Sequence, residues 1–145
     1  MTDPGSAKAP TAPVPVKCIS IVLCEAIYPV GTSGNLIIVN TFHELTSSGF
    51  PTRFPKITVL YTVTNGHGTY DLEIAIVNAA TGEAAIAVSR PTVLNNPLMI
   101  MDIYGVLHQV PLPEPGKYWL EVRCDGAMIG QRPFNVALCP PPAGP

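Results

Sequence analysis

Apolar and polar residues alternate with a period of two along most of this chain. The clearest case runs from Lys56 to Thr64, where four apolar side chains share one face and Lys and Thr share the other. A period of two puts successive side chains on opposite faces of a strand, whereas a helix repeats every 3.6 residues. No stretch of any length shows the helical period. The pattern therefore predicts strands that each bury one face.

The pattern and the turn residues together predict about eight strands. Asn65-Gly66 reads as a tight hairpin turn, because both residues tolerate positive φ. Arg90-Pro91 is expected to end one strand, and Gly105 to mark a bend or bulge in the next. Short strands joined by polar turns are typical of two antiparallel sheets packed face to face. The strands are expected within residues 16–26, 36–42, 56–64, 69–78, 83–89 and 98–110, and as a hairpin in 115–136.

The fold class is thus all-β: a single antiparallel two-sheet β-sandwich of immunoglobulin-like architecture. Tyr118, just after Pro115-Gly116, stands where such domains often place a corner tyrosine. The alternation also predicts which side chains form the core. We expect Ile57, Val59, Tyr61, Leu72, Ile74, Leu120, Val122 and Phe134 to be mostly buried.

Two early segments are apolar on both faces. They are Val16–Ala26, with the run ISIVLC, and Leu36–Phe42, with the run LIIV. Strands that are apolar on both faces are usually covered on both faces. We therefore expect these two segments to be central strands, or strands covered by a loop.

Trp119, the only tryptophan, departs from the inward pattern of its strand. It shares a face with Glu121 and Arg123, opposite the face of Tyr118 and Leu120. Three environments fit this position: a loop or tail of the same chain, a partner protein or second copy, or the aliphatic parts of neighbouring side chains. Tryptophan is enriched in interface hot spots. We favour contact with a second chain, so Trp119, Glu121 and Arg123 are the candidate interface.

Composition divides the chain into a domain and two ends. Residues 1–15 and 139–145 are rich in Pro and Ala and are expected to be flexible, which leaves 16–138 as one β-sandwich domain. Only 12% of the residues are charged, against about 25% in a typical protein. The eight Lys and Arg residues are scattered and the net charge is −2, so we expect no binding to nucleic acid.

The sequence also gives expectations about location. No basic run followed by an apolar stretch opens the chain, and no apolar run approaches the ~20 residues that span a bilayer. We expect a cytoplasmic protein with no membrane contact. None of the four cysteines forms a Cys-x-x-Cys pair, so they are expected to be buried reduced thiols, with a disulfide between strands as the alternative.

Few residues suggest chemistry. His43 and Glu44 are adjacent at a strand end and point to opposite faces, and His67 lies in a turn, so all three are expected to be solvated. Asp102 stands among large apolar residues and is expected to be buried with a structural hydrogen-bond partner. His108 would share the side of Asp102 only if no bulge intervenes. We expect no metal, cofactor or catalytic residue.

Several motifs together are similar to a known family. They are VLCEAI, a Gly-rich turn with NLIIVNTF, the Phe50-Pro51 and Phe54-Pro55 pairs, and the closing hairpin LPEPGKYWLEVRCDGAMIGQRPFNV. Across Val16–Val136 the chain resembles a family of small bacterial proteins that is recorded as a domain of unknown function. The resemblance implies a β-sandwich and no reaction.

These observations predict a non-catalytic protein-binding or assembly module that contacts a protein partner or forms a homodimer. A structural subunit of a larger particle, such as a phage-like or secretion-type assembly, is the first alternative. A small-ligand binder is the second, and it would require a cavity.

Overall fold

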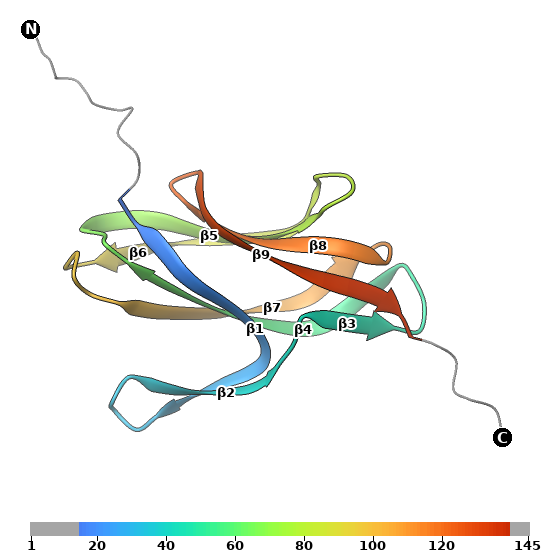
Figure 1. Cartoon of the computed structure of the whole chain (residues 1–145), viewed down its shortest axis with the longest axis horizontal. Coiled ribbons are helices and arrows are strands. Elements are labelled where there is room, and N and C mark those ends of the chain that lie inside the picture. The colour runs from blue at the N-terminus through green and yellow to red at the C-terminus, as the bar shows by residue number, and fades with distance from the viewer. Residues whose placement is uncertain (1–14, 140–145) are drawn as a thin grey trace, which may run out of the picture.

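The computed structural model describes residues 15–139, and these residues form strands and no helix (Figure 1). The strands are β1 Lys17–Val30, β2 Asn35–Thr41, β3 Glu44–Ser47, β4 Thr52–Thr64, β5 Gly68–Asn78, β6 Ala84–Leu94, β7 Met101–Leu112, β8 Gly116–Cys124 and β9 Ala127–Leu138. The division of the chain into a domain at 16–138 and two ends stays a prediction. The ends expected to be flexible lie almost wholly outside the described residues, so that expectation stays a prediction.

The strands form two sheets that pack face to face as an immunoglobulin-like sandwich. A four-stranded sheet has the order β2-β1-β4-β7, and a five-stranded sheet has the order β3-β9-β8-β5-β6 (Figure 1). All neighbours are antiparallel except β3 and β9, which run parallel. The predicted fold class is confirmed, with nine strands in place of about eight. The additional strand is β3, which lies in the segment that we read as a strand end.

The connection after β4 differs from the hairpin that the sequence predicts. Asn65 has a φ of 71°, as the expected turn requires. However, β4 pairs with β1 and β7, and β5 pairs with β6 and β8, so residues 65–67 carry the chain from one sheet to the other. Turn residues specify a local change of direction, and they do not specify which strand becomes the neighbour.

The core lies between the two sheets and is built from alternate residues of facing strands. All eight side chains that the period-two pattern predicts to be buried are at most 4% exposed. They are joined by Leu23 and Leu107 from the four-stranded sheet and by Ile76 and Val136 from the five-stranded sheet. The predicted register of β5 is also confirmed, since Leu72 is buried whereas Asp71 is exposed.

Two predicted features of the later strands are wrong. β6 continues through Arg90 and Pro91 to Leu94, because it is an edge strand and the missing N–H of Pro91 leaves no partner unsatisfied on its open side. β7 passes Gly105 without a bulge, because its pairing with β4 is continuous from Met101 to Leu107.

Candidate functional site

The hairpin of β1 and β2 extends beyond the sheet to which it belongs. β1 pairs with β4 only as far as Cys24, which faces Thr58. Beyond that point β1 pairs with β2 alone, from Ala26 opposite Val39 to Val30 opposite Asn35. Figure 1 shows this blue-to-cyan hairpin projecting from the body of the sandwich. We call residues 26–39 the arm.

The arm exposes apolar side chains and carries no charge. Its sequence is AIYPVGTSGNLIIV. Directly opposed residues of an antiparallel pair share a face, so Tyr28 and Ile37 lie on one face and Ile27 and Ile38 on the other. Tyr28 is 57% exposed and Ile37 is 53% exposed. Val30, Ile38 and Val39 are exposed as well.

The expectation that the second apolar segment is central or covered is wrong for the isolated chain. β2 is an edge strand, and every residue from Ile37 to Thr41 is exposed. A two-stranded ribbon without a third strand or a packed face is only marginally stable in water. The arm therefore has the composition of a buried pair of strands. The rest of the chain nevertheless leaves it exposed.

The apolar surface continues from the arm onto the outer face of the four-stranded sheet. Val22, Leu60 and Tyr104 are paired in a row across β1, β4 and β7, and they lie on the side opposite the core. Leu60 is buried by its neighbours, whereas Tyr104 and Val106 are exposed. The outer face of this sheet thus carries an apolar row that the sandwich core does not use.

Asp102 also lies on this outer face, and its predicted burial is wrong. The residue is exposed, and its Oδ1 accepts a hydrogen bond of 2.7 Å from the hydroxyl of Thr62. The expected structural partner is therefore a side chain on β4. His108 shares the face of Asp102, since no bulge intervenes. Six residues of strand separate them by about 20 Å, so they cannot act on one substrate atom.

Of the other candidate polar residues, His43 and Glu44 are neighbours in the chain, and His67 lies in the connection between β4 and β5. His43, Glu44 and His67 are all exposed, as predicted. Within residues 15–139 no group of three His, Cys, Asp or Glu side chains is placed to hold a metal ion. The same residues contain no helix long and apolar enough to cross a bilayer.

The structure places Trp119, Glu121 and Arg123 side by side on the outer face of the five-stranded sheet. The amine of Lys117 lies 4.5 Å from the centre of the Trp119 ring, which is partly buried. Arg123 donates a 2.6 Å hydrogen bond to Glu121, whose side chain is only 12% exposed. The prediction that the Trp119 side chain points away from the core is confirmed, and Lys117 of the same strand covers part of its ring. Contact with a second chain stays a prediction.

The four cysteines are free thiols, and the expectation of burial holds for only two of them. Cys24 and Cys124 are fully buried, Cys18 is half-buried and Cys139 is exposed. Burial raises the pKa of the Cys18, Cys24 and Cys124 thiols, in the last case to about 11. Raised thiol pKa values leave little nucleophilic thiolate at neutral pH.

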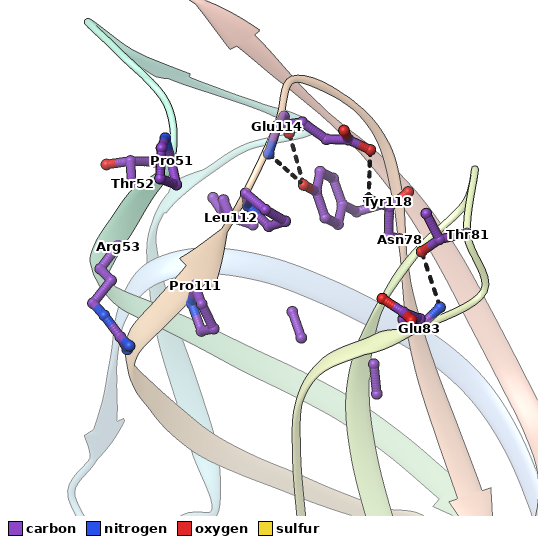
Figure 2. A pocket seen from close by; sticks show the side chains of 13 residues that line it. Pro51, Thr52, Arg53, Asn78, Thr81, Glu83, Pro111, Leu112, Glu114 and Tyr118 are labelled. Carbon is purple, nitrogen blue, oxygen red and sulfur yellow. Dashed lines mark hydrogen bonds between the residues drawn. The ribbon is translucent and has the colours of Figure 1, made fainter.

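A cleft of about 740 Å³ opens at one end of the sandwich (Figure 2). The Tyr118 hydroxyl lies at the cleft and donates a 2.7 Å hydrogen bond to the backbone carbonyl of Glu114. The amide of Asn78 donates to the Glu114 carboxylate at 3.1 Å. Arg53, on the opposite wall, donates to the carbonyl of Gln109. The cleft therefore has polar groups, and most of them are already paired with one another or with the backbone.

The Tyr118–Glu114 bond is the corner tyrosine that the sequence predicts. We expect Tyr118→Phe to lower the free energy of unfolding by about 1–2 kcal/mol. The change removes one hydrogen bond and leaves the backbone carbonyl of Glu114 without this donor. Urea unfolding of the two proteins measures the difference. The matched control is Tyr104→Phe on the outer face, which should change stability very little. Equal losses in the two variants would contradict a specific role for the corner bond.

One solved structure that matches this chain is consistent with the architecture. The alkylpurine DNA glycosylase AlkC of Pseudomonas fluorescens, solved bound to DNA that contains an abasic site analog, matches with a TM-score of 0.54 and 14% identity. The match covers 86% of this chain and 31% of the glycosylase, so this chain spans about a third of that protein's length. At this identity the similarity shows the fold alone.

An immunoglobulin-like protein from Pseudomonas aeruginosa matches with a TM-score of 0.40 and 16% identity, over 88% of this chain and 99% of that one. No curated protein matches the sequence. Residues 19–137 match the profile of DUF6941, a family of unknown function, over nearly the same span as the resemblance drawn from the motifs. The chain therefore belongs to the family DUF6941.

Proposed function

We propose that this protein is a non-catalytic module that binds another polypeptide chain through the arm. One observation carries the proposal: a stretch of 14 residues with no charge and with apolar side chains on both faces projects from the sandwich without cover. Exposed apolar surface of this kind marks interaction sites in soluble proteins. The separation of Asp102 and His108 along β7 supports a non-catalytic role.

A cytoplasmic location is part of the same proposal. Four free thiols, one of them exposed, fit a reducing compartment, because disulfides form and persist in oxidising ones.

The first test compares binding by matched single variants of the full chain. Immobilised wild-type protein is exposed to an extract of the native cell, and each retained protein is purified and titrated against it. We expect at least one retained chain, either a different protein or an untagged copy of this one, to bind stoichiometrically. Tyr28→Lys should weaken that binding by about tenfold or more, because it places a charge where an apolar contact is made.

Val93→Lys is the matched control, since Val93 is a similarly exposed residue of an edge strand outside the arm. It should bind as the wild type does. If the Tyr28→Lys variant binds as tightly as the wild type, the arm is not the binding surface. In that case Trp119→Ala tests the other surface, and a loss of about 2 kcal/mol or more would assign the contact to Trp119 and its neighbours.

The second candidate function is binding of a small molecule in the cleft of Figure 2. Its volume lies in the range of about 300–1,000 Å³ that ligand pockets occupy. A binding site also needs polar groups that are free to converge on a ligand. Tyr118 and Asn78 already donate to Glu114, the first to its backbone carbonyl and the second to its carboxylate. The arm exposes apolar side chains that no part of the chain covers, whereas polar groups at the cleft already have hydrogen-bond partners. We therefore place protein binding first.

A further inference from the structure

Among the four edge strands that the structure describes, β2 is the one with no charge and no proline, and its one irregularity is Asn40 near its end, with a φ of 56°. The two sheets have four edge strands, β2, β7, β3 and β6. β3 has only four residues, β6 carries Arg90 and Pro91 at its middle, and β7 contains Pro111 and Gln109, whose φ is 51°. Short length, charge, proline and backbone irregularity are the usual protections of a free edge. The sequence of β2, NLIIVNT, has no charge and no proline.

The polar and apolar residues of β2 are arranged almost symmetrically about its middle. Asn35 stands at one end, Asn40 and Thr41 stand at the other, and four aliphatic residues lie between them. Suppose that a second β2 runs antiparallel and is centred on Ile38. Ile38 then lies opposite its own copy, Ile37 opposite Val39, and Asn35 opposite Thr41. The apolar centre of the strand meets itself and the polar ends meet each other, while Leu36 lies opposite Asn40. The matched apolar centre favours pairing of the strand with itself.

Charge also favours a second copy as the occupant. The chain carries a net charge of −2, yet the arm has no charged residue, so two copies can approach through it without like charges meeting. A twofold axis perpendicular to the sheet brings the same edge of a second copy into antiparallel register. Such a contact is isologous and closes after two copies.

We propose that β2 pairs with β2 of a second copy of this chain and joins the two four-stranded sheets into one continuous sheet of eight strands. The inference rests on the proposed function and names its partner. Pairing supplies main-chain hydrogen bonds to the open edge. It also places Ile37 and Val39 of each copy beside those of the other, on the face that continues to Tyr28 and the outer face of the sheet.

The test uses the position at the centre of the expected pairing. The full-length protein and its Ile38→Lys and Ile38→Glu variants are examined by sedimentation over a wide concentration range. We expect the wild type to be a dimer. Each variant should dissociate at least about tenfold more readily, because like charges would lie opposite one another at the axis. An equimolar mixture of the two variants should recover dimers, since lysine then faces glutamate.

Val93→Lys is again the control and should dimerise as the wild type does. Hydrogen exchange should show the β2 amides protected in the dimer and open in either Ile38 variant. Ile38 is already partly exposed, so we expect both variants to fold, and an unchanged melting transition at low concentration checks this.

Several results would overturn the inference. They are a wild type that is monomeric at every concentration, a dimer that neither Ile38 variant weakens, variants that fail to recover on mixing, and assembly that continues beyond two copies. If the protein is monomeric while capture of another protein still depends on Tyr28, the inference fails and the proposed function stands. If capture is independent of the arm and no dimer forms, both fail.

Discussion

Phe134→Ala is expected to lower the free energy of unfolding by about 3–5 kcal/mol, the usual cost of truncating a buried phenylalanine. Phe134 lies on β9, is 2% exposed and belongs to the core between the sheets. Its ring stacks on that of Tyr118 with the centroids 5.8 Å apart. The substitution removes this contact and leaves a cavity that the flanking strands can fill only in part. Urea or thermal unfolding measures the loss.

Met128→Ala is the control for this prediction. Met128 lies on the same strand and is 47% exposed, so its truncation should change stability by less than about 0.5 kcal/mol. A loss in the Phe134 variant no larger than that of the control would show that the end of β9 does not help to hold the sheets together.

Alkaline pH is expected to destabilise the fold by about 2–3 kcal/mol through Cys124 alone. Burial raises the pKa of this thiol to about 11 from its ordinary value of 9.0, and the nearby Asp125 and Asp71 carboxylates add to the effect. Between these values the unfolded chain has lost the thiol proton while the folded chain keeps it. The contribution of Cys124 to the free energy of unfolding is therefore fully present below about pH 9 and is lost as the pH rises towards 11. Its size follows from about 1.4 kcal/mol for each unit by which the folded and unfolded pKa values differ.

Urea unfolding at a series of pH values, in the presence of a reductant, measures this loss. Cys124→Ala removes the titrating group and should flatten the curve between about pH 9 and pH 11. Part of the fall should persist in the variant, because burial also raises the pKa of Tyr61 and Tyr118. If wild type and variant lose the same free energy across this range, Cys124 does not titrate as described.

The core of this fold could be read from the sequence because burial in a sandwich follows the period of the strand. Leu72 and Ile74 alternate with Asp71 and Glu73, and that contrast alone fixes which face of β5 is inward. The tyrosine corner was predictable for a similar reason. Tyr118 and its partner Glu114 are four residues apart, so the signal is local.

Features that depend on distant partners were not predictable. β3 has four residues, and its ladder is made with Asn135–Leu138 at the other end of the chain, so nothing near Glu44 reveals it. The Asn65-Gly66 pair specifies a turn and leaves open which sheet receives the next strand. The apolar neighbours of Asp102 predict its burial, but they include Tyr104, which faces solvent on the outer side of β7.

The arm shows a different limit of sequence analysis. The run from Leu36 to Val39 predicts a covered strand, and the structure leaves it exposed. A pattern of apolar residues reports that a segment suits burial, and it carries no information on whether the cover comes from the same chain. The absence of charge across residues 26–39 was the available sign of the candidate site.

The step from one sheet to the other after β4 also sets the order in which the protein can fold. β1 and β2, β5 and β6, and β8 and β9 are neighbours in the chain, and each pair can form across a short turn. β4 has no such neighbour, because its partners are β1 and β7, and Tyr61 must meet Ile103 from far along the chain. Closing a long loop costs entropy before any contact is made, and sandwiches accordingly fold in milliseconds to seconds. The same holds for β5 and β8, where Leu72 must meet Cys124. We expect the pairing of such distant strands, and not the formation of any hairpin, to limit the folding rate.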